Sequence, residues 1–177
     1  MIYQCKLQSR EGEILKKLYI KQKAISIGDK YKIFDENDKL LYYVNSKLFS
    51  INHKKFIYNA NDEIVMILRR KFFDILPQYL IYDKNNKLIA GIRKKFSINQ
   101  KYVMESWGGE KFNAEGNFFT FNLQFFRGDQ LIGSMSKKII QLVDSYQVEV
   151  INDSDVELII AFVIAFDNLM HNNSKHR

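Results

Sequence analysis

The sequence predicts a mostly β protein, a closed antiparallel barrel of about twelve strands that encloses one hydrophobic C-terminal helix. Three observations lead to this prediction. Apolar positions recur every 24 residues, each repeat places a cluster of turn residues between two stretches of β-prone residues, and the last apolar segment changes to a helical pattern. A constant period of this length is typical of repeated supersecondary units.

The repeats have the pattern of hairpins. Their first strands share apolar residues at a step of 24, namely Ile33, Ile57 and Ile81, each followed by an aromatic residue at 34, 58 or 82. Asn- and Asp-rich clusters follow at 35–39, 59–63 and 83–87, and a shorter one that contains Gly128 lies at 127–130. Asn, Asp and Gly accept the backbone angles of tight turns, so each cluster predicts a strand–turn–strand unit.

The second strand of each hairpin alternates between apolar and basic side chains. Because successive strand residues point to opposite faces, one face is mostly apolar and the other carries the cations. The basic positions are equivalent from repeat to repeat: Lys47, Lys71, Lys95 and Lys138, with Arg69 and Arg93 two residues before their lysines. We expect these six residues, called the basic band below, to surround the outside of the barrel toward one end.

We expect one domain over residues 1–177, with strands over about 18–151, a central helix over about 154–170 and a disordered tail at 171–177. Short connections between the hairpins indicate a continuous antiparallel meander. Sheets of a dozen strands rarely stay open and flat, because closure removes the exposed edges.

The helix is assigned to the interior because residues 158–166 are all apolar. A helix that is apolar on every side is buried on every side. Ser154 and Glu157 have the spacing of a capping box at its start. A barrel of twelve strands is too wide to be filled by its own side chains, and the small inward residues Ala90 and Gly133 leave room for a helix. A helix packed on one face of an open sheet is the alternative.

Composition and motifs argue against an enzyme. The net charge is +7, the single cysteine excludes an internal disulfide, and no apolar run reaches the length of a membrane span. No partner at metal-ligand or catalytic spacing exists for any of the three histidines, His53, His171 and His176. The same is true of Cys5. We therefore expect a cytoplasmic protein with no metal and no cofactor.

The segment "IKQKAISIGDKY" (20–31), the repeated hairpins and the closing apolar helix resemble the LURP-one-related family of tubby-C-terminal-like proteins. Phospholipid scramblases are distant relatives. The resemblance covers about residues 18–170 and implies a twelve-stranded barrel around a central C-terminal helix. Its tubby branch binds phosphoinositides and its scramblase branch is linked to lipid movement, whereas this chain resembles the compact bacterial members, for which the resemblance implies the fold but no ligand. The chain lacks the Pro-rich N-terminus and cysteine cluster of scramblases, which argues against scrambling.

Two functional hypotheses follow. In the first, the basic band binds anionic phospholipid headgroups at the membrane periphery, at about 1 kcal/mol per Lys or Arg, and Trp107 at a hairpin tip inserts at the interface. In the second, the protein is an interaction scaffold, the positive charge is only a solvated outer face and Trp107 packs on the barrel rim. Nucleic-acid binding is a weaker hypothesis because the sequence shows no RNA-binding motif or recognition helix. The oligomeric state is left open.

Overall fold

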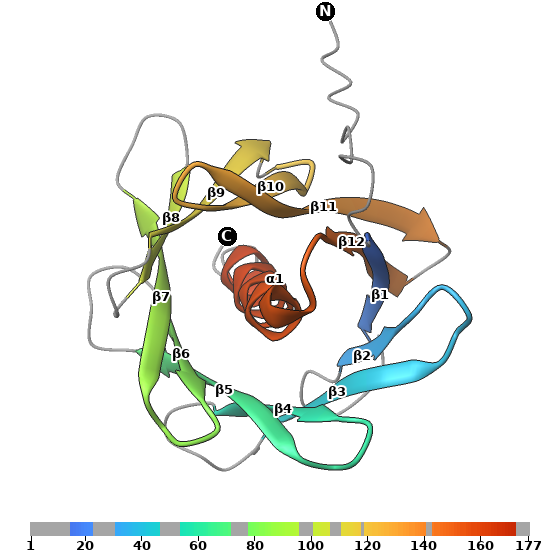
Figure 1. Cartoon of the computed structure of the whole chain (residues 1–177). Helices are drawn as coiled ribbons and strands as arrows, with labels where there is room; N and C mark the ends of the chain where they lie inside the picture. Colours follow the sequence, from blue (N-terminus) through green and yellow to red (C-terminus); the bar gives the residue numbers. More distant parts are fainter. Residues whose placement is uncertain are drawn as a thin grey trace, which may run out of the picture.

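The computed structural model describes residues 15–22, 31–46, 54–71, 78–95, 101–106, 111–117, 119–140 and 143–172. Within these ranges, twelve strands form one antiparallel sheet in the order β8-β7-β6-β5-β4-β3-β2-β1-β12-β11-β10-β9. The sheet curls around a single α-helix, α1 (Figure 1). The mostly β fold with a C-terminal helix is therefore confirmed.

The strands follow the chain as a meander. Their bounds are β1 (Lys16–Gln22), β2 (Tyr31–Phe34), β3 (Leu40–Ser46), β4 (Lys55–Asn59), β5 (Ile64–Lys71), β6 (Gln78–Asp83), β7 (Leu88–Lys95), β8 (Lys101–Ser106), β9 (Phe112–Asn117), β10 (Asn122–Arg127), β11 (Gln130–Ile140) and β12 (Val143–Val150). Among the described strands, the one pairing between strands distant in sequence joins β1 to β12, with Ile20 opposite Tyr146. This pairing brings the start of the sheet to the strand that precedes α1.

The two strands at the ends of the sheet are β8 and β9. They lie next to each other in Figure 1, but the described residues show no strand pairing between them. The sheet thus wraps around the helix, whereas its closure into a hydrogen-bonded barrel stays a prediction. The alternative of a helix on one face of an open sheet does not describe this arrangement, because inward side chains from strands on all sides share one core with α1.

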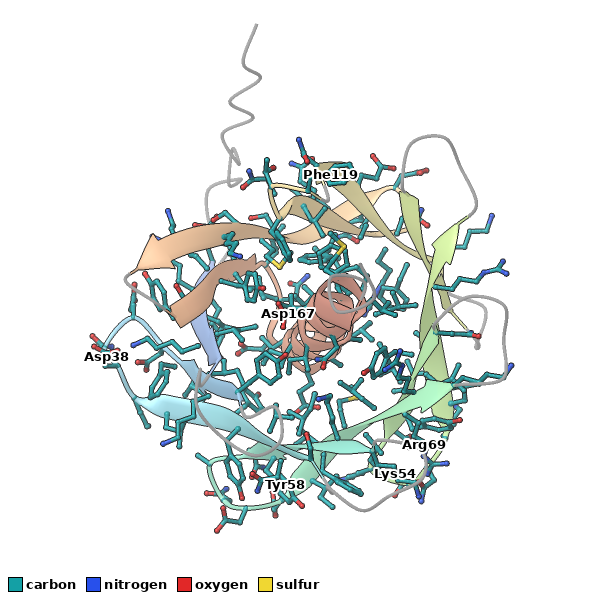
Figure 2. All side chains as sticks on the ribbon, turned by 180° about the vertical axis from the view of Figure 1, so that it is seen from behind. Asp38, Lys54, Tyr58, Arg69, Phe119 and Asp167 are labelled. Carbon is teal, nitrogen blue, oxygen red and sulfur yellow. The ribbon has the colours of Figure 1, made fainter. Side chains whose placement is uncertain are left out.

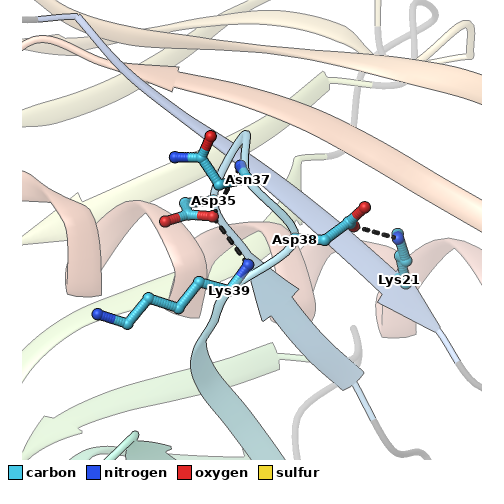
Figure 3. A network of polar contacts seen from close by, with 5 residues as sticks. All are labelled: Lys21, Asp35, Asn37, Asp38 and Lys39. Atoms are coloured by element: carbon cyan, nitrogen blue, oxygen red, sulfur yellow. Dashed lines mark hydrogen bonds and ion pairs between the residues drawn. The ribbon is translucent and has the colours of Figure 1, made fainter.

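Three hairpin turns repeat the same hydrogen-bond pattern. In the first (Figure 3), the Asp35 side chain accepts the backbone N–H groups of Asn37 and Lys39, both at 2.9 Å. Equivalent bonds form at Asn59 and at Asp83. Each turn also contains one non-glycine residue with positive φ: Asp38, Asp62 and Asn86. Asn and Asp tolerate this left-handed backbone, so the clusters at a 24-residue step specify the turns as predicted.

The helix α1 (Val156–Asn172) is the centre of the core. Every residue from Leu158 to Leu169 is buried, as the apolar run predicted. Phe162 packs edge-to-face on Phe125, with ring centroids 5.1 Å apart. A Cβ at Gly133 would lie 3.0 Å from the Ile159 side chain and 2.5 Å from the Glu149 carbonyl oxygen. Gly133 therefore allows a close approach between sheet and helix, which confirms the prediction of small inward residues.

The start of the helix differs from the prediction. Ser154 is not an N-cap in a capping box, because it lies inside a 3₁₀ turn at Asp153–Asp155 that precedes α1. Two ion pairs join this segment to the sheet. Arg127 binds the buried Asp155 carboxylate, and Lys16 binds Asp153 at 3.0 Å. These contacts hold the connection from β12 to α1 against β1 and β10, so local capping is not needed.

Candidate functional site

A repeated side-chain contact holds each of the three Asx turns. In every case one side chain from a neighbouring strand contacts the outer aromatic ring of the repeat and also binds the positive-φ residue of the turn. We call these contacts the turn clasps: Lys21 with Phe34 and Asp38, Tyr43 with Tyr58 and Asp62, and Arg69 with Tyr82 and Asn86. The Lys21–Asp38 ion pair is visible in Figure 3. In the second clasp, the hydrogen bond to Asp62 raises the pKa of the Tyr43 hydroxyl.

Arg69 of the basic band is part of a turn clasp. Its guanidinium carbon lies 4.3 Å from the Tyr82 ring centroid, and one terminal nitrogen donates to the Asn86 side chain. The side chain is half-buried. These contacts give Arg69 a structural function that the alternation of charges along β5 did not reveal, because the turn it binds lies 17 residues away.

Replacement of Arg69 by alanine is expected to lower the free energy of unfolding by about 1–2 kcal/mol, because it removes one hydrogen bond and one cation–π contact. The matched control is Lys138→Ala, which removes an exposed cation of the same band and should change stability by less than about 0.5 kcal/mol. Urea denaturation measures both. Equal effects for the two variants would contradict the structural role of Arg69.

Two rows of outward positions contain the other described members of the basic band. On one side of the sheet, Gln78 of β6 lies between Lys71 of β5 and Arg93 of β7 in the strand register, and both cations are exposed. In the second row, Lys138 of β11 pairs with Ser145 of β12, and Ser145 pairs with Lys21 of β1. Lys21 in turn pairs with Lys32 of β2.

The described members of the basic band therefore lie in two groups with β4 and β3 between them, and the continuous band stays a prediction. The sequence reasoning missed that Lys21 and Lys32 share a register row with Lys138, two and three strands away from it. Lys47, Trp107 and the side chain of Lys95 lie outside the described residues.

Charge is distributed unequally between the two ends of the wrapped sheet. The turn end comprises the four predicted turns and the segment that leads into α1 (35–39, 59–63, 83–87, 127–130 and 151–155). It contains nine acidic residues and four basic residues, three lysines and Arg127. The opposite end, where α1 finishes, has exposed cations near the strand ends: Lys32, Lys71, Arg93 and Lys138. We call it the basic end.

The interior at the basic end contains a buried carboxylate. Asp167 of α1 is 1% exposed and lies inside the ring of strands (Figure 2). The Tyr31 hydroxyl donates to one of its oxygens at 2.6 Å and the Tyr146 hydroxyl donates to the other. The Asn168 amide donates to the Tyr31 oxygen at 3.0 Å. Buried polar groups are stable when hydrogen-bonded in this way, so the network fixes the last turns of α1 against β2 and β12.

Sequence reasoning also missed this network. A local signal existed, because Asp167 and Asn168 directly follow the apolar run that ends at Phe166. A further cation faces inward on β4: Lys55 is 3% exposed and donates to Ser46 at 3.4 Å. Lys55 occupies the repeat position held by Tyr31 and Tyr79. The 24-residue period thus predicts that Lys55 points inward, although a lysine is normally expected on the protein surface.

The other end of the helix has a raised carboxyl pKa. Desolvation raises the pKa of Glu157, and the positive charge of Lys84 partly opposes this. Burial likewise raises the pKa of Tyr42, with the charges of Glu157 and Asp153 acting in the same direction. Among the described residues, no group of His, Cys, Asp and Glu could hold a metal ion.

The fold and the core define a class of protein in which a large antiparallel meander surrounds one apolar C-terminal helix. A model of the LURP-one-related family matches residues 16–167, and the chain belongs to this family. A search of curated proteins found no match. Helices of the described segments are all too short or too polar to cross a bilayer.

A solved structure supports the fold. An Arabidopsis thaliana protein determined by X-ray crystallography is similar to this chain with a TM-score of 0.62 and 17% sequence identity. The similarity covers 86% of this chain and 91% of the plant protein. At this identity it shows the fold alone, and the wider relation to tubby proteins stays a prediction.

Proposed function

We propose that the protein is a non-enzymatic, cytoplasmic member of the LURP-one-related family that binds anionic phospholipid surfaces through the basic end of its sheet. The observation that supports this most directly is the separation of charge between the two ends. Exposed cations at one end attract an anionic surface, while the acidic turns at the other end are repelled by it. The charge distribution therefore orients the molecule with the end of α1 toward the membrane.

The exposed positions Lys71, Arg93 and Lys138 are the members of the basic band that the proposal uses. They lie near the ends of β5, β7 and β11, in two separate parts of the wrapped sheet. They therefore form separate contacts with a flat surface. At about 1 kcal/mol for each cation near an anionic surface, three such contacts produce reversible binding and not permanent attachment. Because the charges are exposed, binding should weaken as salt increases.

Lys71→Glu combined with Arg93→Glu is expected to weaken binding to anionic vesicles at least about thirtyfold, since two contacts of about 1 kcal/mol are lost. Co-sedimentation with vesicles that contain phosphatidylserine measures the effect. Vesicles of phosphatidylcholine alone should bind neither protein.

The matched control is Lys39→Glu combined with Lys87→Glu. It changes the net charge by the same amount, but at two exposed positions of the turn end. The equivalent position of the middle repeat already holds Glu63, so the fold accommodates the change. The control should bind nearly as well as the original protein. Equal loss in both variants would mean that net charge alone matters, and absence of salt-sensitive binding by the original protein would leave the scaffold hypothesis.

A further inference from the structure

The hairpin of β9 and β10 has its tip at the basic end. β9 begins beside the turn end, where the Gly128 amide donates to the Lys111 carbonyl at 2.7 Å, and it runs toward the end where α1 finishes. The described residues of the tip, Asn117 and 119–122, therefore lie at the same end as Lys138 and the Asp167 network. Figure 2 shows Phe119 of this tip on the outside of the wrapped sheet.

The conformation of the tip is held by local hydrogen bonds. The Asn117 side chain accepts the backbone N–H groups of Phe119 at 3.0 Å and Thr120 at 3.1 Å. The Asn122 amide donates to the Thr120 hydroxyl at 3.0 Å. Gly116 has φ of 129°, and a Cβ there would lie 2.3 Å from the Asn122 carbonyl oxygen. The chain thus turns sharply between two strands that lie unusually close together.

Phe121 attaches this tip to the core. Its backbone is left-handed, with φ of 56°, which is unfavourable for a bulky residue. Its ring is buried, at 5.5 Å from Tyr146 and 5.4 Å from Phe166 between centroids, and Lys137 lies 4.8 Å from the ring centre. The packing of Phe121 on α1 compensates for the backbone strain, and it also fixes the direction in which the neighbouring Phe119 projects.

Phe119 projects into solvent. It is 66% exposed, and it is the large hydrophobic side chain that the described part of the chain leaves open to water. Two residues away, Phe121 is buried in the same tip, so the exposure of Phe119 is a consequence of the turn geometry. Lys137 and Lys138 lie on β11, the strand that pairs with β10 beside the tip. An exposed aromatic ring at the same end of the sheet as the exposed Lys138 matches the chemistry of a bilayer interface, where apolar insertion and headgroup attraction act together.

We propose that Phe119 of this tip inserts into the boundary between headgroups and acyl chains of an anionic bilayer. This inference rests on the proposed function and gives it a second contact of a different kind. The cations provide salt-sensitive attraction, and Phe119 provides apolar burial that salt does not screen. The hydrogen bonds of Asn117 and the buried Phe121 hold the described part of the tip with Phe119 exposed.

Phe119→Ala is expected to weaken binding about tenfold or more to vesicles of phosphatidylcholine with about 30% phosphatidylserine. The salt dependence should stay the same because no charge changes. Phe119→Trp is expected to keep binding, and its added fluorescence, obtained by subtracting the spectrum of the original protein with its single Trp107, should shift to the blue when vesicles are added. Asp129→Trp, on the turn between β10 and β11 at the opposite end, is the matched control and should show no shift.

The outcomes separate the two proposals. If the original protein does not bind anionic vesicles, both the proposed function and the insertion of Phe119 are wrong. If it binds with salt sensitivity, while Phe119→Ala binds equally well and Phe119→Trp shows no shift, the insertion alone is overturned. A change of oligomeric state in Phe119→Ala with unchanged vesicle binding, measured by sedimentation velocity, would identify the tip as a contact between copies of the chain and would also overturn it.

Discussion

Replacement of Phe162 by alanine is expected to lower the free energy of unfolding by about 3–5 kcal/mol, the range for large-to-alanine changes of buried aromatic residues. Phe162 is 1% exposed and lies between two partners of the core. Its ring is edge-to-face with Phe125 of β10 at 5.1 Å and stacked with Phe166 of α1 at 6.0 Å. The surrounding sheet is hydrogen-bonded along its length, so it cannot collapse into the space that the ring leaves.

The control for this prediction is the same substitution at Phe119, which is exposed. Phe119→Ala should change the free energy of unfolding by less than about 0.5 kcal/mol. Chemical denaturation followed by far-UV circular dichroism measures both variants. If the two substitutions had similar effects, α1 would not be the centre of the core, and the wrapped architecture would be wrong. The control also shows that any loss of vesicle binding in Phe119→Ala is not a loss of folding.

The second large effect is expected at the buried carboxylate. Tyr31→Phe combined with Tyr146→Phe removes the two hydroxyl donors to Asp167 but keeps both rings in the core. Hydrogen bonds to charged groups contribute about 1.5–3 kcal/mol each, so the double variant should lose about 3–5 kcal/mol. Thermal and urea denaturation measure the loss.

A third substitution distinguishes the loss of these bonds from a loss of packing. Asp167→Asn introduced into the double variant should recover part of the stability. Once the tyrosine donors are gone, a neutral amide costs less free energy to bury than a carboxylate. In the original protein the same substitution should be destabilising, since both tyrosines then lose a charged acceptor. If Asp167→Asn had the same effect in both backgrounds, the tyrosine hydroxyls would not act on Asp167.

The hairpins could be predicted from sequence because their determinants are local. The residues that make each Asx turn are at most four apart in sequence. The inward positions Ile33, Ile57 and Ile81 follow from the alternation of a strand, and all three have 0% exposure. The burial of α1 follows from a run of apolar residues that has no polar side.

The candidate site could be predicted only in part. The alternation placed Lys71 and Arg93 on the outer face, but it did not show that Arg69 holds a turn or that Lys21 and Lys32 share a register row with Lys138. That row depends on strand register. The pairing of β1 with β12 joins residues more than 120 positions apart, and a one-residue shift would exchange the two faces.

By itself, the amino-acid sequence determined the repeated hairpins with their turns, the apolar inner face and the buried helix. Each of these features depends on the side-chain preferences of residues that are close together in the sequence. The tertiary structure alone decided the turn clasps, the ion pairs at the start of α1, the hydrogen bonds of Asp167 and the separation of acidic and basic ends. Tyr31 and Asp167 are 136 residues apart, and such contacts form only when strand register and sheet curvature bring their side chains together.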